Sequence, residues 1–191
     1  MKKNIYVVLT QTSSVLSAVI KIFTRNEFNH SSISLSESLD PMWSFGRRQP
    51  YNPFWGGFVK EFIYKGTFYR FPKTKCAVYR FEVNESVYDA VLYELNQMYS
   101  EKEKYGYDFL GLCLAAVHIP LQRKRKYYCS GFIRSLFLKC KVPGAETLGE
   151  ITKPCDFISF PGMTPVYKGL LKDYPNSIKL NEKTSVSSIC S

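Results

Sequence analysis

The stretch KYYCSGFIRSLF, residues 126–137, places a cysteine at the start of a segment with helical periodicity. Apolar side chains recur at positions 132, 133, 136, 137 and 140, which is the spacing of one face of an α-helix. Cys129 lies on that same face, so we expect its thiol to point into the fold. The free N–H groups and the macrodipole at a helix N-terminus stabilise a thiolate. The pattern therefore favours Cys129 as a reactive cysteine, although a buried packing thiol would show it too.

The other cysteines and the two histidines limit the possible chemistry. Of six cysteines, no two have C-x-x-C spacing, and the only histidines are His30 and His118. A zinc site built from Cys and His pairs is therefore not expected, and we predict no metal and no cofactor. Reduced thiols are expected, and most of the cysteines at positions 76, 113, 140, 155 and 190 are predicted to be small core residues.

A base for the thiol is predicted at the start of HSSISLSES, residues 30–38, which alternates as a half-buried strand does. Alternation puts His30 on one face with the serines at 32, 34 and 36. A face with only small hydroxyls behind the histidine leaves room for a close-packed helix, so Cys129 is expected on that face. His118 is the rival base, but it lies in the apolar run LCLAAVHIP and is predicted to be structural.

The rest of the chain alternates predicted strands and helices. The clearest helix covers residues 84–105, with Asn84 or Ser86 as its cap. We predict one α+β domain over residues 1–175 and a polar, flexible tail over residues 176–191. Further strands are predicted at 4–11, 42–47, 58–66 and 76–83, helices at 13–25 and 105–119, an extended segment at 151–160 and a strand or helical turn at 164–171.

The chain is basic, with 26 basic and 16 acidic residues and a net charge of +10. The main basic run, RKRK from Arg123 to Lys126, is a solvated loop or a patch for weak contact with anionic surfaces. No nucleic-acid-binding motif accompanies it, so no nucleic acid is expected as a partner. The N-terminal apolar run is too short for a secretory signal, which predicts a soluble, cytoplasmic protein.

Four segments together resemble circularly permuted papain-like proteins of the NlpC superfamily, which includes distant relatives of lecithin:retinol acyltransferase. IYVVLTQTSSVLSAVIKIFTRNEFNHSSISL, residues 5–35, is similar to the strand, helix and histidine strand that open those domains. YGYDFLG at 105–111 and KYYCSGFIRSLF at 126–137 resemble the Tyr-Asp-Phe segment and the nucleophile helix. ITKPCDFISFPGMTPVY at 151–167 resembles the closing segment. The resemblance implies an antiparallel, barrel-like sheet packed against helices that include the nucleophile helix.

The resemblance also implies roles for individual residues. Cys129 would be the nucleophile and His30 the general base and later the general acid. The third residue, which orients the imidazole, falls by position at Ser44, a departure because serine supports an imidazolium less well than a carboxylate. Glu37 is the alternative, but strand parity puts it opposite His30. Gly131 is a second departure, at a position where the family often has Glu or Gln.

Other residues are candidates for contact with the reacting group or the substrate. The backbone N–H of Cys129 and the side chain of Tyr107 would bind the oxyanion, and Tyr128 is a neighbouring candidate. Trp43 and Trp55 either line a substrate groove or form a packed loop.

The expected activity is thiol-dependent hydrolysis of an amide by a peptidase or amidase, with a peptide, amide or acyl-lipid substrate. Lipid acyl transfer or thioester cleavage on the same scaffold is the first alternative, and a non-catalytic binding module is the second.

Overall fold

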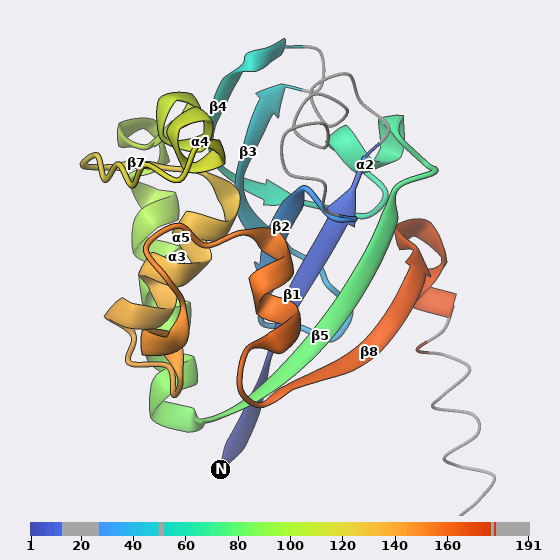
Figure 1. The fold of residues 1–191 in the computed structure, drawn as a ribbon. Helices are drawn as coiled ribbons and strands as arrows, with labels where there is room; N and C mark the ends of the chain where they lie inside the picture. Colours follow the sequence, from blue (N-terminus) through green and yellow to red (C-terminus); the bar gives the residue numbers. More distant parts are fainter. Residues whose placement is uncertain (13–26, 50–51, 177, 179–191) are drawn as a thin grey trace, which may run out of the picture.

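The computed structural model describes residues 1–12, 27–49, 52–176 and 178. They form a mixed α and β structure built on one six-stranded antiparallel sheet (Figure 1). The strands follow the order β4-β3-β2-β1-β5-β8, so the sheet formed by the described strands is open, and the expected barrel-like closure between its outer strands is not seen. Their bounds are β1 Lys2–Gln11, β2 His30–Ser34, β3 Met42–Gln49, β4 Asn52–Glu61, β5 Lys75–Asn84 and β8 Met163–Leu170.

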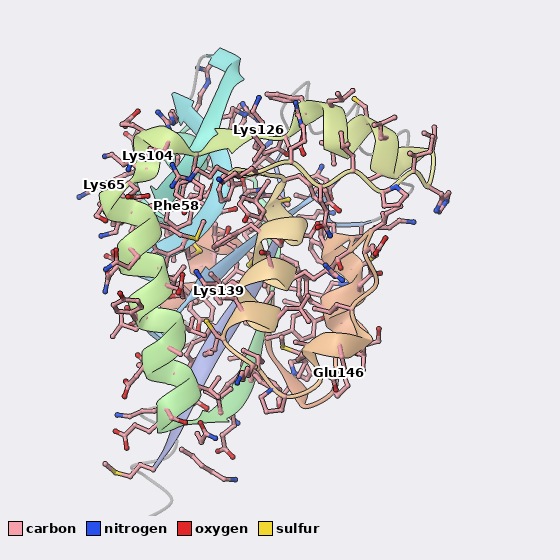
Figure 2. The ribbon with its side chains drawn as sticks, turned by 90° about the vertical axis from the view of Figure 1, so that its left-hand side faces the viewer. Phe58, Lys65, Lys104, Lys126, Lys139 and Glu146 are labelled. Carbon is pink, nitrogen blue, oxygen red and sulfur yellow. The ribbon has the colours of Figure 1, made fainter. Side chains whose placement is uncertain are left out.

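Two helices, α3 (Glu85–Ser100) and α5 (Cys129–Lys139), lie side by side over one face of the sheet (Figure 2). Asn84 caps α3 as predicted, because its side chain accepts a hydrogen bond from the backbone N–H of Val87 at 2.9 Å. The remaining elements are α2 (Gly66–Arg70), α4 (Phe109–Ala116), the short parallel strands β6 (Gly106–Tyr107) and β7 (Lys126–Tyr127), and the 3-10 turns η1 (Lys102–Lys104), η2 (Ala145–Thr147), η3 (Pro154–Ser159) and η4 (Leu171–Asp173).

The two faces of the sheet bury separate apolar clusters. On β1, Val7 points to the cluster under α3 and α5, whereas Val8 points to a second cluster on the other face. Burial on both faces explains why β1 is a nearly continuous apolar run. The side chains by which α5 joins the first cluster are Phe132, Ile133, Leu136 and Phe137.

Several predicted elements agree with the structure and others do not. The strands predicted at 4–11, 42–47 and 76–83 and the helix at 129–140 are confirmed. The strand predicted at 58–66 instead begins at Asn52 and ends at Glu61. Pro154–Ser159 is a 3-10 turn rather than extended, because the carboxylate of Asp156 accepts a hydrogen bond from the Lys153 N–H.

The helix predicted at 13–25, and all of the predicted tail except residues 176 and 178, lie outside the described residues. None of the described helices combines the length and the hydropathy of a transmembrane segment.

Candidate active site

Helix α5 places a thiol at its first residue. α5 begins at Cys129, and the preceding Tyr128 is extended and offers no side-chain cap. The first N–H groups of the helix therefore have no intrahelical acceptor. Cys129 is 3% exposed and lies on the buried side of α5. The predicted inward orientation of Cys129 is confirmed.

His30, the first residue of β2, meets this thiol. The imidazole side chain is 18% exposed and interacts with Cys129 both by a hydrogen bond and by charge. The backbone of Ser31 also acts on the same sulfur by hydrogen bonding. The structure therefore brings together the cysteine and histidine that the sequence singled out. The rival base, His118, is exposed after the end of α4, at a backbone φ of 62°.

The helix packs on the opposite face of β2 from the one expected. Ile33 shares the apolar cluster of α5, whereas His30 and Ser32 lie on the other side of the strand with Glu61. β2 and β3 pair only at Ile33 and Ser34, so the two strands separate toward the His30 end. His30 and Cys129 nevertheless act on each other, since each shifts the pKa of the other.

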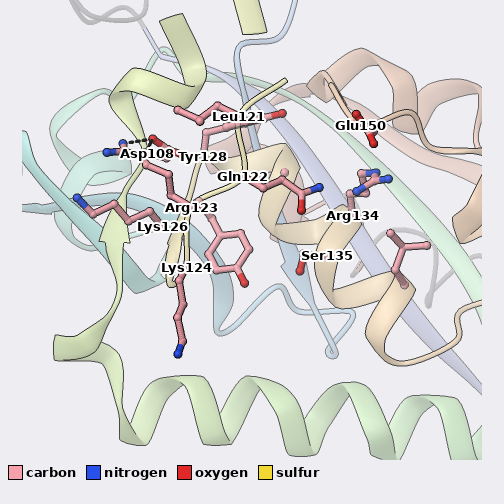
Figure 3. A pocket seen from close by; sticks show the side chains of 13 residues that line it. Asp108, Leu121, Gln122, Arg123, Lys124, Lys126, Tyr128, Arg134, Ser135 and Glu150 are labelled. Atoms are coloured by element: carbon pink, nitrogen blue, oxygen red, sulfur yellow. Dashed lines mark hydrogen bonds and ion pairs between the residues drawn. The ribbon is translucent and has the colours of Figure 1, made fainter. Parts of the chain in front are cut away.

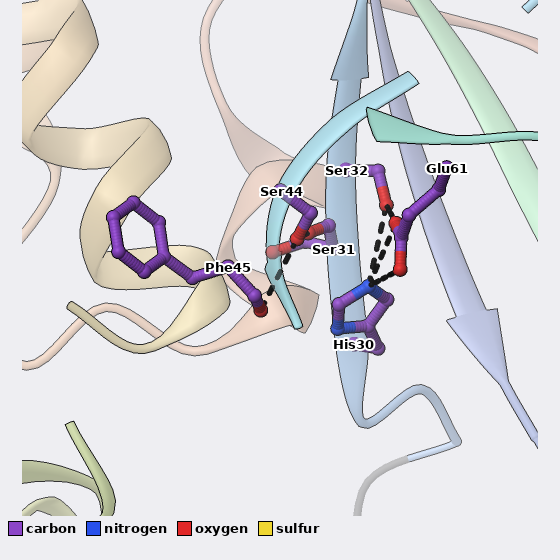
Figure 4. A network of polar contacts seen from close by, with 6 residues as sticks. All are labelled: His30, Ser31, Ser32, Ser44, Phe45 and Glu61. Atoms are coloured by element: carbon purple, nitrogen blue, oxygen red, sulfur yellow. Dashed lines mark hydrogen bonds and ion pairs between the residues drawn. The ribbon is translucent and has the colours of Figure 1, made fainter. Parts of the chain in front are cut away.

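A carboxylate that the sequence analysis did not select holds the histidine. Both oxygens of Glu61, the last residue of β4, lie 3.1 and 3.2 Å from His30 Nε2 (Figure 4). The hydroxyl of Ser32 donates to Glu61 Oε2 at 2.6 Å. Because Nε2 is engaged by Glu61, Nδ1 is the ring nitrogen that remains for Cys129. The order thiol, imidazole, carboxylate is that of a catalytic triad.

Ser44, the residue predicted to orient the imidazole, has a different role. Its buried hydroxyl donates to the carbonyl oxygen of Ser31 at 2.8 Å and so ties β3 to β2 where their backbone ladder has ended (Figure 4). Glu61 is the partner of the imidazole, so the prediction for Ser44 is wrong. The alternative, Glu37, accepts a hydrogen bond at its backbone oxygen from Tyr174, a residue of the second apolar cluster.

Gly46 is a further site residue that the sequence analysis missed. A side-chain carbon at this position of β3 would lie 3.2 Å from Glu61 Oε1 and 3.7 Å from His30 Cε1. Glycine therefore leaves the space that the carboxylate and the imidazole occupy. The signal for Glu61 in the sequence was a single carboxylate inside a predicted strand. The face of the sheet on which Glu61 lies is set by the pairing of Met42 with Glu61, and that pairing depends on the tertiary structure.

The charges of the three groups support one another. Burial lowers the pKa of His30, but the charge of Glu61 and the hydrogen bonds of Cys129 and Glu61 outweigh burial and raise it to about 10. Burial raises the pKa of Cys129, whereas the hydrogen bond and charge of His30 bring it below the ordinary cysteine value. Burial raises the pKa of Glu61, and His30 reverses that effect to a net lowering. Each of the three groups therefore favours the charged form of its neighbour: Glu61 and Cys129 that of His30, and His30 that of Cys129 and Glu61.

The pKa values of three other cysteines shift in the direction opposite to that of Cys129. Burial raises the pKa of Cys76 to about 12 and that of Cys140 to about 11. Burial, followed by the charge of Asp156, raises the pKa of Cys155. These thiols are therefore less acidic than an ordinary cysteine, and Cys129 is more acidic. Within the described ranges, no group of three His, Cys, Asp or Glu side chains is arranged to hold a metal ion.

The acidity of Cys129 gives a testable pH dependence. Alkylation of Cys129 by iodoacetamide is expected to reach half its maximal rate at a pH below the midpoint of a free cysteine, because the imidazolium of His30 keeps the thiolate charged as the pH falls. The rate constant is measured by mass spectrometry of the Cys129 peptide between pH 5 and 9, with exposed Cys113 as the internal reference. A midpoint for Cys129 at or above that of free cysteine would contradict the ion pair.

Tyr107 is close enough to Cys129 for the two groups to act on each other by charge. Burial and then the charge of Cys129 raise the pKa of its phenol well above the ordinary value, so the hydroxyl keeps its proton. A side-chain carbon at Gly56 would lie 2.7 Å from Tyr107 Cβ, so β4 and β6 approach closely at this point. The Tyr107 ring also packs on Phe109 with ring centroids 4.6 Å apart. A protonated phenol near the thiolate, together with the N–H of Cys129, suits the predicted oxyanion site.

The remaining predicted contacts lie elsewhere. Trp43 is 5% exposed and stacks on Phe58 with ring centroids 5.8 Å apart, so it is a core residue rather than a groove residue. Strand parity is the reason, because Trp43 points to the face covered by α3 and α5. The Tyr128 ring lies over Gly131, whose added side-chain carbon would be 3.0 Å from Tyr128 Cζ. Trp55 is on β4, but its side chain lies outside the described part of the structure.

No protein-family model matches the chain, and no curated protein matches it in sequence. What the chain does is therefore inferred from the arrangement of Cys129, His30 and Glu61.

Proposed function

We propose that the chain is a cysteine hydrolase that cleaves an amide bond through a covalent acyl-enzyme. The observation that carries the proposal is the hydrogen-bonded series of a buried acidic thiol, a charged imidazole and a buried carboxylate, Cys129, His30 and Glu61. A packing cysteine needs neither of the two partners, and burial alone would raise its pKa. The same series weighs against a non-catalytic binding module.

The proposed reaction divides amide cleavage into two steps. The thiolate of Cys129 attacks the carbonyl carbon, a C–S bond forms, and the carbonyl electron pair moves to the oxygen. The N–H of Cys129 and the hydroxyl of Tyr107 stabilise that oxyanion. The intermediate collapses, the C–N bond breaks, and the imidazolium of His30 gives its proton to the leaving amine. Water then attacks the thioester, His30 accepts its proton, and the C–S bond breaks to release the acid and restore the thiolate.

The fold proposed for this reaction is the circularly permuted papain-like fold of the NlpC superfamily. Three features support it: the strand of His30 precedes the nucleophile helix in the chain, α5 packs on an antiparallel sheet, and the imidazole has a carboxylate partner. Glutamate is among the residue types that the resemblance implies for this partner. In this structure the partner, Glu61, lies on β4 rather than on β3, the strand that follows β2. The five cysteines among the described residues are free thiols, which suits a reducing compartment, so we propose a cytoplasmic location.

A polar substrate is favoured over an acyl chain. A cavity of about 280 Å³ lies beside Glu61, and its lining includes the charged residues Arg47, Arg48 and Lys65. Burial lowers the pKa of Arg47, and Glu61 and Tyr107 are both near enough to act on it by charge. Val59, Phe62 and Phe68 also line the cavity, but a substrate that enters it beside Glu61 has to lie against the charged groups of Glu61 and Arg47, which suits a polar group better than a hydrocarbon chain. Peptides or other polar amides are therefore the proposed substrates.

Covalent labelling tests the proposal. Peptidyl and fatty-acyl electrophiles are compared on the wild type, on Cys129→Ala and on the matched control Cys113→Ala, whose cysteine is exposed. We expect peptidyl probes to modify the wild type and the control at Cys129, and amide substrates to be hydrolysed by those two proteins alone.

Two results would contradict the proposal. Substrate turnover by Cys129→Ala would show that Cys129 is not the nucleophile. Labelling by fatty-acyl probes in the absence of peptidyl labelling would replace amide hydrolysis with lipid acyl transfer or thioester cleavage.

A further inference from the structure

A second cavity, of about 640 Å³, lies on the outer side of α5 beneath the loop that carries the basic run (Figure 3). Its wall combines the loop residues Lys124 and Lys126 with Arg134 of α5, and Tyr128 and Leu138 add an aromatic ring and an aliphatic side chain. The volume is in the range of small-molecule sites, and it exceeds what a single inorganic anion fills.

This cavity is separate from the candidate active site. At 100° per residue, Gly131, Arg134 and Leu138 lie between 140° and 200° around α5 from Cys129. The thiol points toward β2, whereas these three residues face the cavity. A ligand bound there would therefore not contact the reacting sulfur.

The arginines and lysines of the basic run, which alternate in sequence, differ in their charged partners. Arg123 donates to the buried carboxylate of Asp108, and Arg125 pairs with Glu101 at 3.6 Å. These two arginines attach the loop to the rest of the structure. Arg123, Lys124 and Lys126 all line the cavity, but within the described part of the chain neither lysine forms an ion pair.

Arg134 completes the positive wall from the opposite side. Its Nε–H donates to the carbonyl oxygen of Leu148 at 3.1 Å, which fixes the direction of the guanidinium. No acceptor for its other N–H groups is found among the described residues. The Asp108 charge is neutralised by Arg123, so three cations, Lys124, Lys126 and Arg134, face the single carboxylate of Glu150.

We propose that this cavity binds a small molecule that carries a phosphate group. Figure 3 shows Lys124, Lys126 and Arg134 at different sides of the cavity, so its lining as a whole carries a positive charge, which suits the double charge of a phosphate monoester better than the single charge of a carboxylate. The Tyr128 ring is held flat over Gly131 and presents an apolar surface for the rest of the ligand. A side chain at position 131 would displace that ring, which gives Gly131 a reason to be glycine.

Calorimetric titration with phenyl phosphate, which joins a phosphate to one ring, tests the proposal. We expect saturable one-to-one binding that weakens as salt is added. Lys126→Gln and Arg134→Gln should each reduce the affinity about tenfold or more, as expected for loss of a charge-assisted hydrogen bond. The matched control Lys172→Gln, an exposed lysine on η4, should leave it unchanged. Cys129→Ala should also bind normally, so the result is independent of the proposed hydrolase activity.

Four outcomes would overturn the proposal. Absence of phenyl phosphate binding at low salt would show that the cavity is not a phosphate site. An equal loss of affinity in Lys172→Gln would show that the binding is non-specific attraction to positive charge. Benzoate binding as tightly as phenyl phosphate would exclude selectivity for phosphate. Binding to vesicles that contain phosphatidylglycerol, without binding to soluble phenyl phosphate, would assign the charges to a membrane surface instead. Thermal melting of each variant confirms that the compared proteins are folded.

Discussion

Replacing Glu61 with glutamine is expected to lower the rate of acylation of Cys129 by about two to four orders of magnitude, the range seen when a triad carboxylate becomes an amide. The amide has no charge to stabilise the imidazolium. Its NH₂ group would also donate to His30 Nε2, which leaves the proton on Nδ1, the nitrogen that faces the thiol. That tautomer cannot accept the proton of Cys129.

The measurement is the pH dependence of both alkylation and substrate turnover. In the wild type, activity should rise with pH as the thiolate forms and fall again near the raised pKa of His30, about 10, as the imidazolium loses its proton. In Glu61→Gln the rising limb should move to higher pH, because the thiolate loses its charged partner.

The matched control is Ser44→Ala, which removes a buried hydroxyl of the same region without touching the charge of the triad. It should leave the pH midpoints unchanged even if stability falls. An unchanged midpoint in Glu61→Gln, or an equal shift in Ser44→Ala, would show that Glu61 does not set the charge of His30.

Truncation of Phe132 is expected to have the largest effect on stability. Phe132→Ala should reduce the free energy of unfolding by about 3–5 kcal/mol, the usual cost of removing a fully buried phenyl ring. Phe132 is 1% exposed, and its ring centroid lies 5.3 Å from those of Phe45 and of Phe58. It follows Cys129 by three residues, so the same contacts that stabilise the fold also fix the first turn of α5.

Urea unfolding followed by circular dichroism measures the loss. Leu138→Ala, on the exposed side of the same helix, serves as the control and should cost well under half as much, because Leu138 is 39% exposed. Equal losses for the two variants would mean that the aromatic cluster around Phe132 does not anchor α5.

Local sequence patterns predicted the parts of the site that depend on local structure. Helical spacing gave the orientation of Cys129, because one stripe of apolar residues both buries α5 and carries the thiol. Strand periodicity also placed His30 at the start of β2.

The parts that were missed depend on how strands pair. Glu61 and Gly46 come to the site through the register of β3 with β4, and neither strand indicates that register by its own pattern. The face of β2 was misassigned for a related reason. Serines 32 and 34 are small but buried on the side of Glu61 and Pro41, whereas Ile33 supplies the apolar contact for the helix.

The candidate site is assembled from segments that lie far apart in the chain, and this has a consequence for when its groups can act on one another. The reacting groups come from residues 30, 61, 107 and 129, and they converge only where several non-adjacent segments have already packed. Contacts between residues so distant in the chain form late and carry a high entropic cost. No short fragment contains the pair and its carboxylate, so an unfinished or partly unfolded chain holds Cys129 as an ordinary thiol. The lowered pKa of Cys129 thus depends on the completed fold, because His30 is brought to the thiol only by tertiary packing.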